Sequence, residues 1–183
     1  MPLALAVSAV GSPITPTTIS ASESRTAVWR SRSAAAARKC STVREEVKQT
    51  PSSVPFVASH SNARAICDHE RNLYDDQIRA LADKGGLMGI NFARHFLVED
   101  ASKPEDVSLD QMVDHVDHIV NLVGVDHVAL GSDYDGASMP AELYDAAQLP
   151  KLIDKLRERG YGDEAIQKFG RENWLRVLKQ AWG

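Results

Sequence analysis

From about residue 42 onward, the chain alternates between short apolar runs and amphipathic stretches. The apolar runs at residues 53–59, 87–92 and 127–131 are rich in β-branched and bulky side chains and predict strands. Helical spacing predicts helices at residues 42–50, 75–84, 108–123, 148–159, 163–168 and 172–181. Strands without polar alternation are typical of parallel sheets that are covered on both faces. The alternating order therefore predicts an α/β fold built from parallel βα units.

The predicted helix at residues 108–123 carries a run that looks like a metal cluster, Asp114-His115-Val116-Asp117-His118. Ser108 is a good N-cap for this helix, and Gly124 a good terminator. The apolar stripe of the helix is formed by Leu109, Met112, Val113, Val116, Ile119, Val120 and Val123. Both aspartates and both histidines fall off that stripe. We therefore interpret the run as a solvated face rather than a metal site.

Residues 1–39 differ from the rest of the chain. Ala, Ser, Thr and Pro make up 23 of these residues, Glu23 is the only acid, and no helical or strand periodicity persists. Three interpretations are open: an organelle transit peptide, a disordered tail, or non-native sequence from a wrong gene start. We favour the last, for a reason given below, and expect the folded domain to occupy residues 40–183.

Charge and composition narrow the class of protein. Residues 1–52 carry seven basic and three acidic residues, whereas residues 53–183 carry 14 basic and 22 acidic residues and all six histidines. The overall net charge of −4 argues against nucleic acid as a partner. The two cysteines form no CxxC pair, so neither a disulfide framework nor a thiolate zinc site is indicated. No apolar run is long enough to span a bilayer, no clean signal peptide or anchor is present, and localisation stays open.

Polar side chains follow each predicted strand. His60 stands between two serines after the first strand, Asn91 lies at the end of the second, and Asp133 and Asp135 follow the third. The carboxyl ends of the strands build the active site in βα-barrels. A catalytic or metal site is therefore expected at this edge of the sheet.

These strand ends carry three motifs that resemble the membrane (renal) dipeptidase family, peptidase family M19. The motifs are SHSNARAICDHERNL at residues 59–73, GGLMGINF at 85–92 and VDHVALGSDYDG at 125–136. Their order and spacing match the C-terminal half of the family, from about Val54 to the end of the chain. The resemblance implies the last three βα units of a (β/α)8 TIM-like metal-hydrolase barrel.

The resemblance also implies roles for individual residues. His60 matches a ligand of one of the family's two zinc ions, which a glutamate bridges. Arg71 matches the residue that binds the C-terminal carboxylate of the dipeptide substrate, a good partner for a guanidinium fork. Asp133 matches the catalytic carboxylate, which would take a proton from the metal-bound water and pass it to the leaving amine. Asp135 is assigned to loop structure. His69, Arg94 and His95 are weaker candidates for contact with the substrate.

Several family features have no counterpart. No predicted strand carries the HxD metal pair of the family's first strand, and the bridging glutamate is missing. The position of another metal histidine falls near Lys39. His60 is thus the one match among five expected ligands, and the resemblance fades near residue 40, which is why we favour a truncated or mis-started gene.

The sequence therefore predicts a truncated zinc-dependent dipeptidase. The alternatives are an inactive half-barrel that acts as an interaction module, with a homodimer covering its sheet edge, and another amidohydrolase-type metal hydrolase.

Overall fold

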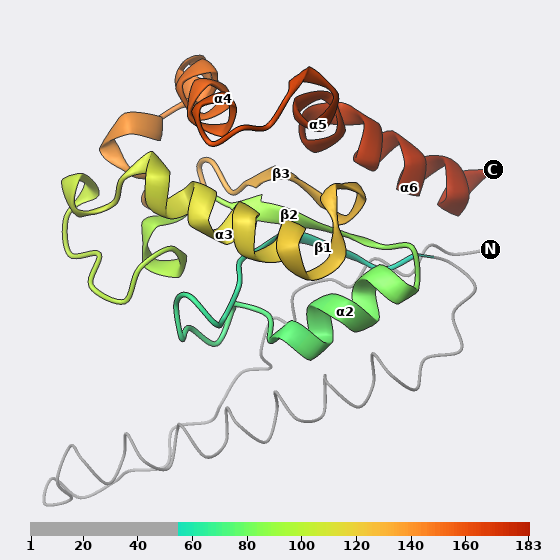
Figure 1. Ribbon diagram of the computed structural model, residues 1–183. Coiled ribbons are helices and arrows are strands. Elements are labelled where there is room, and N and C mark those ends of the chain that lie inside the picture. Colours follow the sequence, from blue (N-terminus) through green and yellow to red (C-terminus); the bar gives the residue numbers. More distant parts are fainter. Residues whose placement is uncertain (1–54) are drawn as a thin grey trace, which may run out of the picture. The chain divides into compact units, whose positions relative to one another are not determined.

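The computed structural model describes residues 55–183, which form a three-stranded parallel sheet with helices packed around it (Figure 1). The strands are β1 (Val57–Ser61), β2 (Leu87–Asn91) and β3 (Val128–Ser132), in the order β1-β2-β3. Both strand pairs are parallel. The predicted α/β class with a parallel sheet is confirmed.

The three strands differ in burial. All five residues of β2 are buried, as expected for a central strand. β1 is only half-buried and Ser59 is exposed, so the prediction of a buried first strand is wrong for this segment. The reason is its place at the end of the described sheet, where β2 is its one strand neighbour. The predicted helix at 42–50 and the start of the predicted strand at 53–59 lie outside the described residues.

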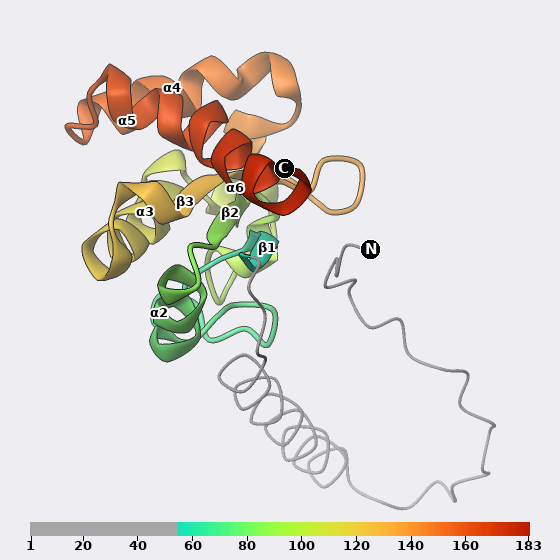
Figure 2. The same cartoon turned by 90° about the vertical axis from the view of Figure 1, so that its right-hand side faces the viewer.

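The helices are α2 (Asp75–Asp83), α3 (Leu109–Val123), α4 (Leu149–Glu158), α5 (Asp163–Gln167) and α6 (Asn173–Trp182). α3 lies between α2 and α4, and α6 packs against β2 and β3 (Figures 1 and 2). The side chain of Ser108 accepts a hydrogen bond from Gln111 N at the start of α3, and the helix ends at Gly124, whose φ is 89°. Both predicted caps of this helix are confirmed.

A π-helical turn, η6 (Lys168–Glu172), joins α5 to α6, where the sequence pattern predicted two separate helices. The wider turn leaves both Phe169 and Asn173 buried. Asn173 Nδ2 donates to Val125 O at 2.8 Å and to Val128 O at 2.7 Å. The π turn thus fixes the last helix to the start of β3.

Two apolar clusters cover the two faces of the sheet. Met88, Ile90 and Val128 belong to the main core, together with the apolar stripe of α3. Leu87 and Ala129 belong to a smaller cluster with Val177 of α6. Because successive strand residues point to opposite faces, the alternation within β2 means that helices cover both sides. No helix in residues 55–183 is long and apolar enough to cross a bilayer.

Single-turn helices occupy the loops that follow β2, α3 and β3. The first of these loops carries η1 (Arg94–Phe96) and η2 (Pro104–Asp106), and η3 (Val125–His127) leads into β3. The loop after β3 carries η4 (Ala141–Leu143) and η5 (Ala146–Gln148). The loops after β2 and β3 lie beyond the carboxyl ends of these strands, where the sequence placed the candidate site.

Candidate functional site

Asp133 follows β3 in an unusual backbone conformation. Ser132, Asp133 and Asp135 have positive φ values of 57°, 89° and 63°. Non-glycine residues in this region cost about 1–3 kcal/mol each and persist where the surroundings hold them. Asn91 Nδ2 donates to Asp133 Oδ2 at 3.1 Å. A Cβ on Gly136 would lie 2.7 Å from Asp133 Oδ1, so the glycine leaves room for the carboxylate.

His60 lies at the end of β1, next to a bulge in the pairing with β2 between Ala58 and Ser61. Its Nδ1 lies 2.7 Å from Ser59 Oγ. If Nδ1 carries the proton and donates to the hydroxyl, Nε2 keeps its lone pair. That is the neutral form in which imidazole binds metals.

The Ser59 carbonyl explains two glycines in the motifs. A Cβ on Gly89 of β2 or on Gly131 of β3 would lie 2.2 Å from Ser59 O. Real Cβ atoms never approach an oxygen so closely, so both positions require glycine. The two glycines let the Ser59 carbonyl of β1 approach the backbone of both β2 and β3.

Asn91 links the ends of the strands. Its Nδ2 lies 3.1 Å from Asp133 Oδ2 and 3.5 Å from His60 O, the second distance being at the limit of a hydrogen bond. Its Oδ1 accepts from Ala93 N at 2.7 Å. The buried side-chain amide of Asn91 thus lies between the backbone carbonyl of His60 and the carboxylate of Asp133.

Arg71 lies on the loop between β1 and α2, and its side chain is exposed. The guanidinium stacks over the Phe96 ring, 5.6 Å from its centroid. The centroid of the His69 ring lies 4.6 Å from that of the same Phe96 ring. Nδ1 of His69 accepts a hydrogen bond from Arg71 N at 3.2 Å. Burial lowers the pKa of His69, which favours the neutral ring that accepts this bond. Among the described residues, no hydrogen bond or ion pair joins Arg71 to His60 or Asp133.

Two buried asparagines tie the Arg71 loop to the loop after β2. Asn62 Nδ2 donates to Asn91 O at 3.0 Å and to Phe96 O at 3.2 Å. Asn72 Nδ2 donates to the same Phe96 carbonyl at 2.9 Å and to Cys67 O at 2.9 Å. Arg71 and the aromatic ring beneath it are therefore held by one network of buried hydrogen bonds.

His115 completes this network, and its position corrects a prediction. Its side chain is fully buried rather than solvated. Nδ1 accepts from Ala63 N at 3.1 Å, and Nε2 lies 2.9 Å from Leu97 O, to which it therefore donates. Burial lowers the pKa of His115 and keeps the ring neutral. The prediction failed because both loops pack on the side of α3 that the apolar stripe left polar.

The rest of the run on α3 is structural. Arg159 Nη1 binds Asp114 Oδ1 at 2.8 Å and Asp117 Oδ2 at 2.6 Å. His118 Nε2 lies 2.7 Å from Asp75 Oδ1. His115-Val116-Asp117 is an HxD triplet, but it lies on a helix and both ring nitrogens of the histidine are engaged. It does not replace the family's metal pair.

Within residues 55–183, no group of three or more His, Cys, Asp or Glu side chains could hold a metal ion. Two zinc ions therefore do not fit the donors of this part of the chain. His60 belongs to no such group among the described residues.

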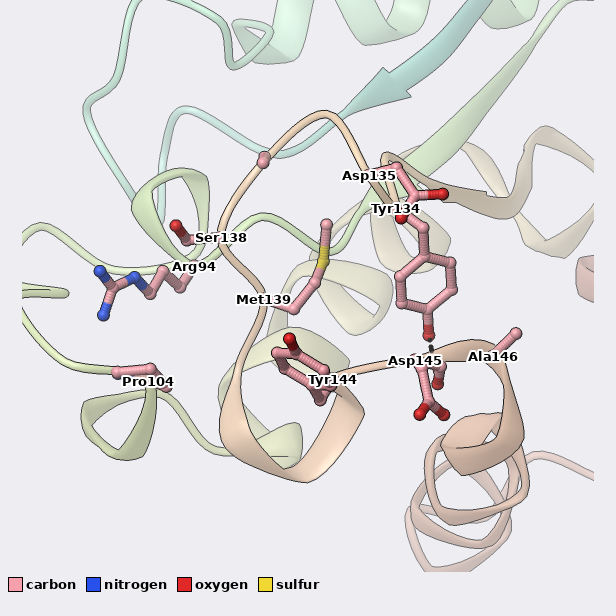
Figure 3. A pocket seen from close by; sticks show the side chains of 10 residues that line it. Arg94, Pro104, Tyr134, Asp135, Ser138, Met139, Tyr144, Asp145 and Ala146 are labelled. Carbon is pink, nitrogen blue, oxygen red and sulfur yellow. Dashed lines mark hydrogen bonds between the residues drawn. The ribbon is translucent and has the colours of Figure 1, made fainter.

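A cavity of about 670 Å³ lies beside the loop that carries Asp133 (Figure 3). Its lining residues come from the loops after β2 and β3 and include Arg94, Tyr134 and Asp135. Arg94, a weak candidate for substrate contact from the sequence, lines this cavity. Asp135, which the sequence assigned to loop structure, lines it as well. His60, Arg71 and Asp133 are not among the lining residues.

Sequence reasoning missed the supporting residues of the site, namely Asn62, Asn72, Phe96 and His115. The asparagines sit in turn-rich loops, where their usual role is local hydrogen bonding. Phe96 carries no polar signal at all. Only their long-range partners identify their part in holding the loops.

Comparison with known proteins supports the resemblance. The family model for membrane dipeptidase (peptidase family M19) matches residues 39–182. An uncharacterized protein in the pqqA 5′ region of Klebsiella pneumoniae is 50% identical over 128 residues, which are 70% of this chain and 47% of that protein.

Two solved structures of metallopeptidases are also similar to this chain. A dipeptidase AC of metallopeptidase family M19 is 39% identical, with a TM-score of 0.69 over 72% of this chain and 39% of that one. A metallopeptidase from Rhodobacter sphaeroides, crystallised with a phosphinate mimic of the dipeptide L-Ala-D-Ala, is 38% identical, with a TM-score of 0.68 over 70% and 37%.

The chain thus spans less than half the length of these relatives. The family match covers most of the chain and includes all three strand-end motifs. The protein therefore belongs to the membrane dipeptidase family, peptidase family M19.

Proposed function

We propose that this chain carries the C-terminal part of a metal-dependent dipeptidase site: one metal ligand, the substrate clamp and the catalytic carboxylate. The observation that supports the proposal best is the Asn91 amide, which lies between the His60 carbonyl and the Asp133 carboxylate. Parallel strands that end together in polar side chains are the usual frame of a barrel active site. The TM-scores of 0.69 and 0.68 against M19 structures are consistent with a partial (β/α)8 barrel.

Arg71 is proposed to bind the substrate's C-terminal carboxylate. Its guanidinium is exposed, stacked on Phe96 and held by an ordered loop, so that a carboxylate can approach its fork. A bidentate contact of this kind is charge-assisted and directional. It would favour dipeptides, because their free carboxylate lies close to the scissile bond.

Asp133 is proposed to accept a proton from the attacking water and to pass it to the leaving amine. The hydrogen bond from Asn91 and the space left by Gly136 hold the carboxylate in one position. A fixed carboxylate is suited to moving a proton between two defined atoms.

The family's zinc ions form no part of these steps, because the described donors do not form a zinc site. His60 is proposed as one ligand, through Nε2. The isolated chain is expected to show little or no dipeptidase activity, because one imidazole cannot hold two metal ions. The purified chain should be assayed with a simple dipeptide and added zinc; turnover of about 1–1000 per second, the range of ordinary enzymes, would contradict this expectation.

The clamp can be tested without turnover. Titration of the isotope-labelled chain with L-Ala-L-Ala should shift the NMR signals of Arg71 and of the loop around it. The amidated dipeptide, which lacks the carboxylate, should shift them less. Arg71→Met should abolish the difference, whereas Arg79→Met, which changes an exposed arginine on α2, should not. Equal binding of the two peptides would refute the clamp.

A second candidate function is an inactive half-barrel that acts as an interaction module. The shortage of metal donors in the described residues and the half-exposed β1 favour it. An uncovered sheet edge invites pairing with another chain, and a homodimer would cover it. Size-exclusion chromatography distinguishes the cases: a monomer at all concentrations would argue against edge pairing.

A further inference from the structure

The cavity beside the Asp133 loop has two unlike ends. Figure 3 shows Arg94, Ser138 and Pro104 on one side, and Tyr134, Asp135 and Asp145 on the other, with Met139 and Tyr144 between them. Its volume of about 670 Å³ falls in the range of small-molecule sites. Its wall is fixed by two hydrogen bonds between the loops after β2 and β3: Phe92 N donates to Ser132 O at 2.8 Å, and Arg94 N donates to Ser138 O at 3.0 Å.

Arg94 is the unexplained group in this cavity. Its Nε and Nη1 are buried and have no hydrogen-bond partner. A buried donor without an acceptor destabilises the folded chain, and more so when the group is charged. Burial of an unpaired guanidinium is therefore a cost that an acceptor at this place would relieve.

Asp106 lies close enough to Arg94 for the two charges to interact, but it does not meet this need. Asp106 Oδ2 is already bound by Lys103 N at 2.7 Å and by Ser102 Oγ at 3.0 Å. These two bonds are the main causes that lower the pKa of Asp106, with a weaker contribution from Arg94. No ion pair between Arg94 and an acid is present among the described residues.

The acids at the opposite end are weaker determinants. Asp135 and Asp145 are exposed, so water solvates their carboxylates. Asp145 Oδ1 also accepts from Ala147 N at 2.9 Å, which uses it as a helix cap. A partner of opposite charge therefore stabilises the half-buried, unpaired guanidinium of Arg94 more than it stabilises these exposed carboxylates.

We propose that the cavity is a subsite for a carboxylate-bearing side chain of the peptide substrate, with Arg94 and the Ser138 hydroxyl as its donors. This inference rests on the proposed peptidase function and names a substrate class for it. The cavity adjoins the proposed catalytic residue, because Tyr134 and Asp135, which line it, directly follow Asp133 in the chain. In Figure 3 the Arg94 guanidinium points away from Met139 and Tyr144, so binding requires it to turn toward the cavity. Its lack of hydrogen-bond partners at Nε and Nη1 permits this movement. Met139 and Tyr144 contact the apolar part of the side chain.

The test uses small probes of the side chain and needs neither metal nor turnover. The full chain, labelled with ¹⁵N, is titrated with glutarate, with its neutral isostere glutaramide and with 1,5-diaminopentane. Glutarate is expected to shift the signals of Arg94 Nε and Ser138 N saturably, with at least tenfold weaker binding of the other two probes. Arg94→Met should remove the glutarate response, whereas Arg157→Met, on exposed α4, should retain it.

Equal binding of glutarate and glutaramide by the unaltered chain, stronger binding of the diamine, or no binding of any probe would overturn the proposal. These comparisons on the unaltered chain hold even if Arg94→Met fails to fold. The two proposals can fail separately. If the cavity binds glutarate but the Arg71 signals respond equally to the dipeptide and its amide, the subsite is supported and the clamp is refuted. The opposite pattern would refute the subsite alone.

Discussion

Replacing His115 with leucine tests the link between α3 and the loops of the candidate site. Leucine has about the volume of histidine, so the change removes the hydrogen bonds with little change in packing. The buried Ala63 N–H loses its acceptor and the Leu97 carbonyl loses its donor. Each unsatisfied group costs about 1–3 kcal/mol, so the free energy of unfolding should fall by about 2–6 kcal/mol, less a part regained by the more apolar side chain. For a domain of ordinary stability, about 5–15 kcal/mol, that is a large fraction.

Urea unfolding monitored by tryptophan fluorescence measures the change, with His118→Leu as the matched control. His118 lies on the same helix, but its side chain is 26% exposed and contacts a half-exposed Asp75. Its replacement should cost no more than about 1 kcal/mol. Hydrogen exchange should also become faster at Ala63 N in the His115 variant alone. A difference between the two variants below about 0.5 kcal/mol would refute the argument that His115 holds the loops.

The remaining predictions use the same unfolding assay. Burial lowers the pKa of His115 in the folded chain, so the unfolded state binds the proton first as the pH falls. The free energy of unfolding should therefore be full above about pH 6.5 and decrease below it. His115→Leu should flatten this pH dependence, and an unchanged pH dependence would contradict the assignment. Gly131→Ala should unfold or strongly destabilise the domain, since its Cβ would lie 2.2 Å from Ser59 O, whereas Gly170→Ala meets nothing within 4 Å and should be neutral or slightly stabilising. Asn91→Ala should cost about 1–3 kcal/mol, because the buried Ala93 N–H and the Asp133 carboxylate lose their partner. A neutral result would show that the amide does not hold the strand ends.

Much of the fold could be predicted from local signals. The apolar runs gave β2 and β3 to within one residue, and Ser108 and Gly124 gave the ends of α3. These signals are readable because apolar runs and helix caps are formed by residues that are close together in the chain. The π turn at Lys168–Glu172 has no such signal, because the packing of Phe169 and Asn173 against β3 selects it.

The candidate site shows the same division. The strand-end motifs pointed to His60, Arg71 and Asp133, and the family match supports the motifs while leaving the roles of the three residues to experiment. The polar side chains of α3 could not be sorted by periodicity. Asp114 faces solvent and Arg159, whereas His115, the next residue, is buried under two loops.

The sequence by itself determined the order of the βα units, the caps of the longest helix and the strand ends at which chemistry is expected. Each of these follows from residue spacing along a short stretch of chain. Only the tertiary structure decided that Asn91 joins two strand ends, that His115 is a buried link between loops, and that Arg94, beside a cavity, has buried nitrogens without a partner. Those facts depend on which distant segments pack together, because a polar side chain is satisfied or left unpaired by neighbours that its own stretch of sequence does not contain.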